Sequence, residues 1–232
     1  MSEQLAPTDR TTLRRRRERG AFERRRIHGV LDEGMVAHVG ICVDGQPFVL
    51  PMAYGRDGDR LILHGSVASR LLRGLDEGLP VCVTVTLLDG LVLARSAFHH
   101  SMNYRSVVVL GTATRITDTE RAAAALDALV DHLVPGRTAE ARPSSPGELR
   151  QTAVLEVPIV EASLKERSGG ASDDPDDLAL DVWAGVVPLG VQPGAPVPNE
   201  DLRPEVLMSP SVRQLAARAP GGSSPGSSTI DG

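Results

Sequence analysis

Much of this chain is a series of strand-length apolar segments, many of them separated by turn-forming residues. Residues 35–43 and 48–54 flank the turn sequence Asp44-Gly45-Gln46-Pro47, which predicts a β-hairpin. Four further segments have a strand pattern: residues 60–65, 81–94, 104–116 and 152–167. This order predicts a meander of about six antiparallel strands that curls into a barrel.

Helical patterns interrupt the strands at three places. Residues 14–33 read as an amphipathic helix, residues 67–77 as a short helix stopped by Gly78 and Pro80, and residues 118–134 as a longer one with Thr117 or Asp118 as its N-cap. Gly111 is expected to mark a β-bulge or bend. The fold class is therefore mainly β, in an α+β setting, with helices flanking the barrel.

Composition divides the chain into three parts. We expect a flexible leader over residues 1–12, a main domain over residues 13–190, and a C-terminal arm and disordered tail rich in Pro, Gly and Ser over residues 191–232. No apolar run approaches the ~20 residues that a membrane span needs, and no signal-peptide pattern begins the chain, so we predict a cytoplasmic location and no membrane partner. Cys42 and Cys82 lie within strand patterns and indicate buried thiols without a disulfide framework.

Two charged segments stand out against the net charge of -5. Residues 14–26 are strongly basic, and residues 173–177 are acidic. Few aromatic residues accompany the arginines, so we expect no nucleic-acid partner and interpret the basic segment as a solvated helix face. A regulator that binds nucleic acid through this segment is the alternative.

A polar turn joins the third strand to the short helix. Here His64, Gly65 and Ser66 are followed by Ser69 and Arg70. Backbone N–H groups at a helix start, two hydroxyls and a permanent cation are the groups that bind a phosphate. Simple helix capping, with Ser66 as N-cap and Arg70 at the surface, explains the same residues and stays open.

A second polar segment contains the paired histidines His99 and His100 and runs through Tyr104, Arg105 and Ser106 into a strand. Consecutive side chains on a strand point to opposite faces, so adjacent histidines rarely share a metal, and we predict no metal site. Trp183, the only tryptophan, fits either a core position or a contact with a partner subunit. No nucleophile elbow, P-loop or dinucleotide motif is present, which favours an anionic ligand and chemistry supplied by a cofactor.

Four stretches carry a resemblance to a known family: HVGICVDGQPFVLPMAYG (38–55), LHGSVASR (63–70), DGLVLARSAFHHSMNYRSVVVLG (89–111) and VWAGVVPL (182–189). With them, residues 14–189 resemble the pyridoxamine 5′-phosphate oxidase-like flavoproteins, in particular the branch that includes the 5-nitroimidazole reductase-like proteins. The resemblance implies an FMN-binding split barrel and a homodimer with FMN at the subunit interface.

The resemblance also implies contacts between individual residues and the flavin. In this family the serine and arginine matched by Ser69 and Arg70 hold the flavin phosphate. The other implied contacts are His64, Gly65 and Ser66 in the same turn, Leu50, Pro51, Met52 and Ala53 at the isoalloxazine edge, Tyr104, Arg105 and Ser106 on the later strand, and Trp183.

This chain also departs from the oxidases. Residues 186–189 are apolar where the oxidases carry the Arg and His that hold pyridoxine phosphate, so vitamin B6 oxidation is not expected. We predict an FMN-dependent oxidoreductase that uses a small-molecule electron donor and reduces a nitro compound or another small organic acceptor, with His64 or His100 moving protons. The alternatives are a flavin- or haem-binding protein without turnover and a deazaflavin-dependent reductase.

Overall fold

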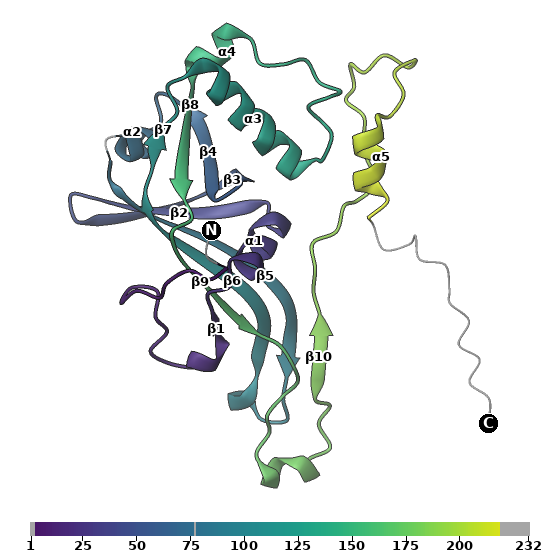
Figure 1. Cartoon of the computed structure of the whole chain (residues 1–232). Helices are drawn as coiled ribbons and strands as arrows, with labels where there is room; N and C mark the ends of the chain where they lie inside the picture. The colour runs from purple at the N-terminus through teal and green to yellow at the C-terminus, as the bar shows by residue number, and fades with distance from the viewer. Residues whose placement is uncertain (1–2, 77, 219–232) are drawn as a thin grey trace.

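A computed structural model describes residues 3–76 and 78–218 of the chain. Within them, ten antiparallel strands form one sheet in the order β1-β9-β6-β5-β2-β3-β4-β8-β7, with β10 paired to β5 (Figure 1). The strands are β1 (Gly20–Ala21), β2 (Val36–Val43), β3 (Gln46–Asp57), β4 (Arg60–Ser66), β5 (Pro80–Leu93), β6 (Ser101–Thr112), β7 (Thr114–Arg115), β8 (Thr152–Pro158), β9 (Glu161–Arg167) and β10 (Gly185–Pro188).

The mainly β split barrel predicted from the sequence is confirmed, but the expected number of six strands was too low. The segment 152–167 divides into β8 and β9 at Ile159 and Val160, while β1, β7 and β10 span only two to four residues each. Strands this short show no alternation of their own and are defined by long-range pairing. The hydrogen-bonded path is open, with β1 and β7 at its ends.

The β2–β3 hairpin forms where the turn signal predicted it. Asp44 and Gly45 both have positive φ, 51° and 77°, and Val43 pairs with Gln46. Two successive left-handed residues match the right-handed twist of the flanking strands, which is why Asp-Gly is favoured at this position.

Alternating side chains from the strands fill the barrel. Val39, Val83 and Val109 face inward and are at most 1% exposed, and Ile27 and Leu31 of α1 (Arg24–Glu33) belong to the same core. On the other side of β3 and β4 lies α3 (Thr119–Leu133), which begins at the predicted N-cap Asp118. A Cβ on Gly55 would lie 2.7 Å from the Leu129 Cα, so the glycine permits this close approach of helix and strand.

Two other helices are short, and two sequence predictions need correction. The chain has α2 (Arg70–Asp76) and α4 (Pro146–Gln151), but no helix over residues 14–23, where the 3₁₀ turn η1 (Arg17–Arg19) leads into β1. Closely spaced arginines repel one another, and pairing of Gly20 with Lys165 on β9 draws the backbone into the sheet. Gly111 pairs regularly with Val81, and the irregularity lies between Leu88 and Gly90 instead.

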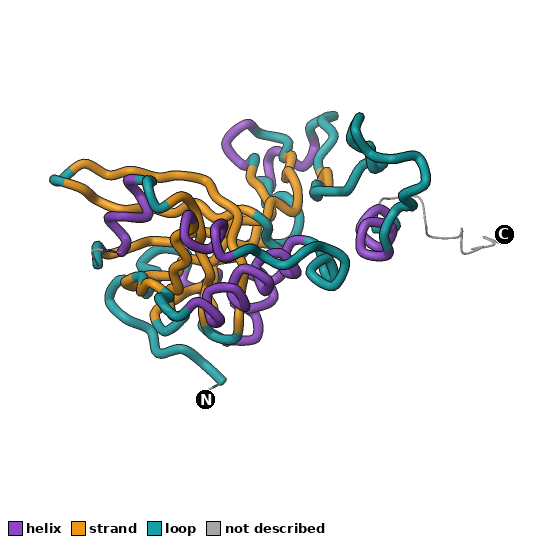
Figure 2. The backbone as a smooth tube through the Cα atoms, turned by 90° about the horizontal axis from the view of Figure 1, so that it is seen from above, coloured by secondary structure: helices purple, strands orange, loops and turns teal. Residues whose placement is uncertain are grey.

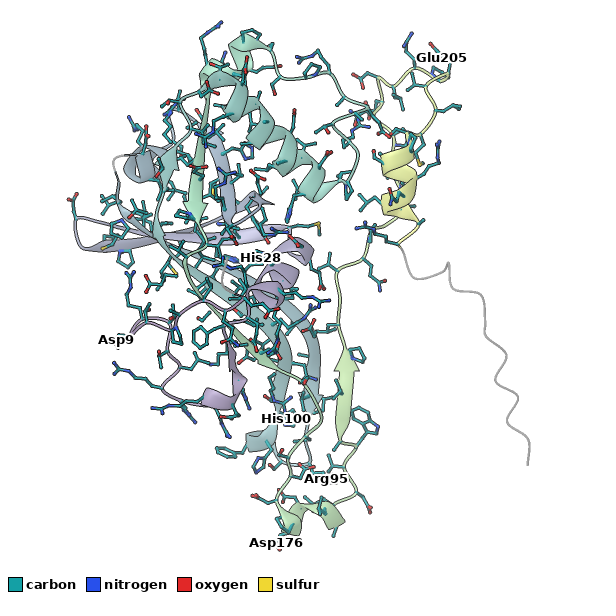
Figure 3. All side chains as sticks on the ribbon, viewed as in Figure 1. Asp9, His28, Arg95, His100, Asp176 and Glu205 are labelled. Atoms are coloured by element: carbon teal, nitrogen blue, oxygen red, sulfur yellow. The ribbon has the colours of Figure 1, made fainter. Side chains whose placement is uncertain are left out.

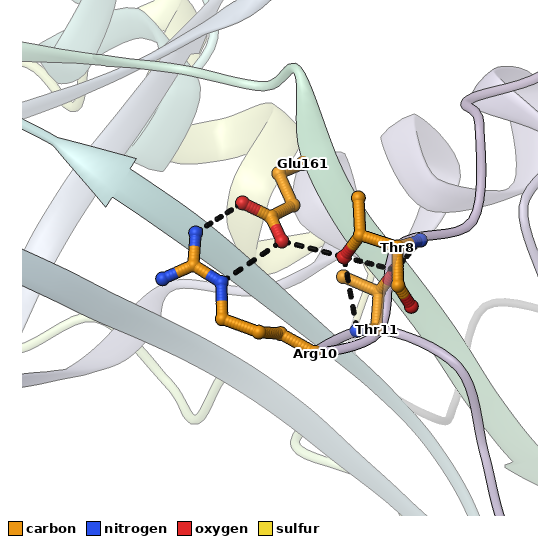
Figure 4. Close-up of polar contacts among 4 residues, drawn as sticks. All are labelled: Thr8, Arg10, Thr11 and Glu161. Atoms are coloured by element: carbon orange, nitrogen blue, oxygen red, sulfur yellow. Dashed lines mark hydrogen bonds and ion pairs between the residues drawn. The ribbon is translucent and has the colours of Figure 1, made fainter.

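The described part of the predicted leader packs against the barrel. Glu161 on β9 accepts hydrogen bonds from Thr8 Oγ1 (2.5 Å) and from Arg10, and the Thr8 hydroxyl is also 3.1 Å from that of Thr11 (Figure 4). Leu5 is only 4% exposed. Thr8 and Arg10 therefore attach this segment to β9, and Leu5 N donates to the carbonyl oxygen of Phe22 (2.9 Å), although the domain boundary at residue 12 itself stays a prediction.

Residues 168–218 form a C-terminal extension that runs along the outside of the barrel. It contains η3 (Pro175–Ala179), β10, a stretch without regular structure and α5 (Pro210–Ala216), a helix that the sequence patterns did not predict. Figures 1 and 2 show α5 set to one side of the strands, beyond α3. Glu140 fastens this helix by accepting hydrogen bonds from Ser211 N (2.9 Å) and Ser211 Oγ (2.5 Å). The predicted disordered tail from Gly221 onward lies outside the described residues.

Helix length bears on the membrane question. Among the helices that the structure describes, none combines the length and the apolar character needed to cross a bilayer.

Candidate functional site

The outer face of the sheet brings several of the predicted contact residues together. Pro51, His38, Thr84 and Val108 are directly paired across β3, β2, β5 and β6, and directly paired residues point to the same side. Their neighbours along the strands, among them Val39 and Val83, fill the barrel, so this row faces outward.

The predicted strand segment 50–53 divides between the two faces. Pro51 and Ala53 point outward with His38 and Val36, whereas Leu50 and Met52 share the inner side with their partners Val39 and Ala37. Leu50 also lines an apolar hollow of about 200 Å³ between the β2–β3 hairpin and α2; its other lining residues are Ile41, Val43, Phe48 and Leu71. The four residues therefore offer two surfaces to a ligand.

His64 lies at the end of β4 on the outer side of the sheet. Pairing of Tyr54 with Leu63 sets Ala53 next to it, and its direct partner on β8 is Val154. Its Nδ1 is buried and has no hydrogen-bond partner within the described residues. Burial lowers the pKa of the imidazole, because the charged form loses more solvation than the neutral form.

The hydroxyls of Ser66 and Ser69 lie in the turn before α2, and each accepts a backbone N–H. Ser69 Oγ accepts from Leu72 N (3.5 Å), and Ser66 Oγ accepts from Ala68 N (3.2 Å). The N-cap is therefore Ser69, immediately before the helix, and not Ser66 as the capping interpretation supposed. Capping uses each oxygen as an acceptor and leaves the hydroxyl hydrogen available to a ligand.

Gly65 and Arg70 are the two other predicted residues of this turn. A Cβ on Gly65 would lie 3.2 Å from Leu72 Cδ2, so the glycine permits close packing of α2. The predicted phosphate contact Arg70 begins α2, and its side chain lies outside the described residues.

Arg105 forms ion pairs with two carboxylates. Its guanidinium donates to both oxygens of Asp89 (2.7 and 3.0 Å) and both oxygens of Glu33 (2.5 and 2.8 Å). Hydrogen bonds to Asp89 and then Glu33 are the main causes that raise the Arg105 pKa. Four of its five donors are thus in use, and the arginine ties β6 to β5 and to α1.

Ser106 points the opposite way from Arg105. On the outer face its hydroxyl is 2.7 Å from that of Thr86, and Tyr104 lies two residues along the same face. Of the three residues predicted to contact the flavin on this strand, only Tyr104 and Ser106 share the outer face with Pro51 and Ala53, and Arg105 points to the other side.

The other predicted residues lie at the far end of the long β5–β6 ribbon. Trp183 is 65% exposed, and its indole rests against Gly185, where a Cβ would come within 2.8 Å of the ring. Figure 3 shows His100, Arg95 and Asp176 together in this lower part of the molecule, while β4, which carries His64, is in the upper part (Figure 1). One subunit therefore does not bring His64 and His100 into a single site.

Sequence reasoning missed three outward-facing polar residues in the middle of this surface: His38, Thr84 and Thr86. The alternation in β2 and β5 contained the signal, since each residue occupies a polar position between buried apolar ones. No grouping of three or more His, Cys, Asp or Glu suited to a metal ion occurs in residues 3–76 and 78–218.

Comparison with known proteins identifies relatives. A family model described as "Pyridoxamine 5′-phosphate oxidase" matches residues 23–166. The flavocytochrome Anf3 from Azotobacter vinelandii is 40% identical, with a TM-score of 0.85 over 91% of this chain and 98% of that one. An "FAD and Heme binding protein" from Mycobacterium smegmatis is 42% identical, with a TM-score of 0.82 over 85% and 97%.

A third solved structure is more distant. A putative 5-nitroimidazole antibiotic resistance protein from Bacteroides thetaiotaomicron is 27% identical, with a TM-score of 0.53 over 62% of this chain and 83% of that one. Among curated protein sequences, none matches this chain.

Proposed function

Because this chain belongs to the pyridoxamine 5′-phosphate oxidase family, we propose that it is a flavin-dependent oxidoreductase with its flavin on the outer face of the sheet. The observation that carries the proposal is the buried, unpartnered Nδ1 of His64. A buried polar atom without a partner is costly unless a ligand satisfies it. The residue itself follows Leu63, the partner of Tyr54, and precedes the turn that leads to Ser69.

The surface around His64 fits a flavin nucleotide. Pro51, Ala53 and Val36 offer an apolar wall to a flat ring, and the hydroxyls of Ser66 and Ser69 retain hydrogens that can be donated to a phosphate. When bound, the flavin supplies the electron transfer, and the protein supplies orientation and electrostatics. His64, neutral at physiological pH because of its burial, would hold or relay a proton at its ring nitrogens.

The flavin nucleotide of this proposal is either FMN or FAD. The family resemblance favours FMN, whereas the name of the 42% identical relative contains FAD. Both share the ring and a phosphate, so the residues above suit either, and chromatography of the released chromophore distinguishes them.

A homodimer completes this proposal. The outer face exposes apolar side chains, including Val36 (50%) and Leu88 (42%), and Trp183 projects from the extension. A second copy that covers this face would enclose the flavin at the subunit interface. We further propose small-molecule electron donors and acceptors, among them nitro compounds, and a cytoplasmic location.

Haem is the second cofactor that we propose. The two relatives of 40% and 42% identity are named a flavocytochrome and an FAD and haem binding protein. The match to the flavocytochrome covers 91% of this chain, so it includes most of the C-terminal extension that lies beyond the family model.

The first experiment combines a spectrum with a matched pair of variants. The protein is purified from flavin-replete cells, its visible spectrum recorded, and the flavin affinity measured for Ser69→Asp and Ser69→Asn. Both residues cap helices well, so α2 is retained, but only the aspartate places a negative charge beside the phosphate. We expect Ser69→Asn to retain flavin and Ser69→Asp to lose it. Equal flavin affinities of the two variants would show that the phosphate does not bind at this turn.

The proton role of His64 requires turnover. We expect His64→Ala to slow reoxidation of the reduced protein by a nitroaromatic compound or oxygen, and His99→Ala, a change far from this site, to leave the rate unchanged. Equal rates for His64→Ala and the unsubstituted protein would exclude the role.

A further inference from the structure

The end of the β5–β6 ribbon carries an exposed apolar surface built from three strands. Met102, Leu91 and Val187 are directly paired across β6, β5 and β10, so they point to the same side. Their exposed fractions are 49%, 40% and 41%, which is high for three adjacent large apolar residues in a sheet. We call this surface, together with the next row (Leu93, Gly185 with the Trp183 indole, and His100), the ribbon platform.

The next row closes the ribbon platform at both edges. Leu93 pairs with Gly185, and the exposed Trp183 indole lies against this glycine. On the β6 side the row ends at His100, which directly precedes Ser101, the partner of Val92. An aromatic ring therefore borders the platform at one edge and an imidazole at the other.

The imidazole of His100 is held in one tautomer. Its Nδ1 lies 2.9 Å from the carbonyl oxygen of Ser96, and a carbonyl can only accept, so Nδ1 carries the hydrogen. Nε2 then presents its lone pair and has no hydrogen-bond partner among the described residues. A histidine that donates one ring N–H to a backbone carbonyl and leaves the other nitrogen free is the usual arrangement of a metal-ligating imidazole.

The loop that carries His100 is also fixed in place. Asp173 of the extension accepts from Arg95 N (2.8 Å) and from Arg95 Nη1 (2.7 Å), and the Asp173 side chain is only 3% exposed. Because the extension supplies this contact as well as β10, the platform forms only where the extension is present.

We propose that the ribbon platform binds haem and that His100 would hold the haem iron through Nε2. The inference rests on the proposed function, which includes haem as a second cofactor. A haem is planar and largely apolar and needs an imidazole, thiolate or thioether for its iron, and the platform offers an exposed apolar sheet surface beside an imidazole with one free ring nitrogen. Its β10 side is made by the extension, which lies outside residues 23–166, the part that the family model matches.

The other histidines suit the role less well. His99 Nε2 is 3.2 Å from Asp174, His132 Nε2 is 2.8 Å from the Gly34 carbonyl, and His28 is 3.0 Å from Asp59. His38 and His64 lie on the central outer face, away from the platform, and serve as the competing positions in the test.

The test uses the full-length protein, freed of haem and reconstituted with hemin. Visible and electron paramagnetic resonance spectra report the axial ligand, and titration reports the affinity. We expect His100→Ala to lose the imidazole-ligated spectrum and to bind hemin about tenfold or more weakly, and added imidazole to restore the spectrum. The matched control His99→Ala, from the adjacent position, is expected to keep both properties.

A second readout separates the platform from the ligand. Trp183 is the only tryptophan of the chain, so hemin bound on the platform is expected to quench the intrinsic tryptophan fluorescence. Val187→Glu should weaken hemin binding without changing the ligand spectrum, because it alters only the apolar surface.

Three outcomes would overturn the inference. Loss of ligation in His38→Ala or His64→Ala, with His100→Ala unchanged, would locate the iron on the central face. Hemin binding that leaves the Trp183 fluorescence unquenched would show that the hemin does not bind on the platform. A protein that binds flavin but not hemin would overturn the haem site and leave the flavin proposal standing, whereas one that binds neither would overturn both.

Discussion

The barrel and the C-terminal extension are stabilised in different ways. In the barrel, strands and α1 share a continuous core in which residues such as Ile27, Leu61 and Leu155 are fully buried. In residues 168–218, which the structure describes throughout, no apolar side chain is buried, and large ones such as Leu207 (82%) face solvent.

The extension is attached at a few points instead of through a core. Asp173 binds Arg95, β10 pairs with β5, and Ser211 binds Glu140. Because these attachments are polar or through the backbone, the apolar side chains of the extension are not required for its folding and remain available to a cofactor or a second subunit.

The largest effect is expected when the same substitution, Leu to Ala, is compared between the barrel and the extension. Leu155→Ala, at 0% exposure, should lower the free energy of unfolding by about 2–5 kcal/mol, because it removes buried methylene groups and leaves a cavity. Leu207→Ala, at 82% exposure, should change it by less than about 0.5 kcal/mol. Urea unfolding of both variants measures the contrast, and similar values would show that the extension has a core in solution.

A smaller effect is expected from two glycines. Gly55→Ala should destabilise the barrel by about 1–3 kcal/mol, because its Cβ would meet the α3 backbone at Leu129. Gly29→Ala is the control: it lies in α1, has no atom within 4 Å of the added Cβ, and should stabilise by about 0.5–1 kcal/mol. The opposite signs are readable from thermal unfolding, and a stabilising Gly55→Ala would contradict the close approach of α3.

A local effect is expected at the Asp173 attachment. Burial opposes ionisation of this carboxyl, but the hydrogen bonds from Arg95 outweigh it and lower the Asp173 pKa. The attachment is therefore intact above the ordinary Asp pKa of about 3.9 and is lost as pH falls through the depressed value. Asp173→Asn should increase proteolytic cleavage in residues 167–182 severalfold at neutral pH without changing global unfolding. Asp176→Asn, which removes an exposed carboxylate nearby, should not.

The smallest effect is expected at α5. Hydrogen bonds from Ser211 and Ser209 lower the pKa of Glu140 to about 2. A depressed carboxyl pKa stabilises the attached helix above the unfolded-state value of about 4.3 and ceases to do so as pH falls toward 2. Hydrogen exchange in residues 210–216, corrected for its intrinsic pH dependence, should accelerate over this range, and Glu140→Gln should abolish the acceleration. An unchanged pH profile in the glutamine variant would show that Glu140 does not hold the helix.

Parts of the fold and of the site could be predicted because their signals are local. The hairpin at Asp44-Gly45, the N-cap Asp118 and the strand alternation each depend on residues a few positions apart. The helix predicted over residues 14–33 was half wrong because pairing of β1 with β9, more than a hundred residues away, outweighed the amphipathic pattern.

The strand and helix periods, the turn chemistry and the family of the chain all follow from the order of its residues. Other features require the folded chain: Arg105 binds Glu33 and Asp89 while Ser106 faces outward, and His64 keeps a buried nitrogen without a partner among the described residues. Folding also brings Trp183 and His100 to the edges of one surface. The physical reason is that pairing register and long-range contacts set which side chains meet, and neither is encoded in the spacing of neighbouring residues.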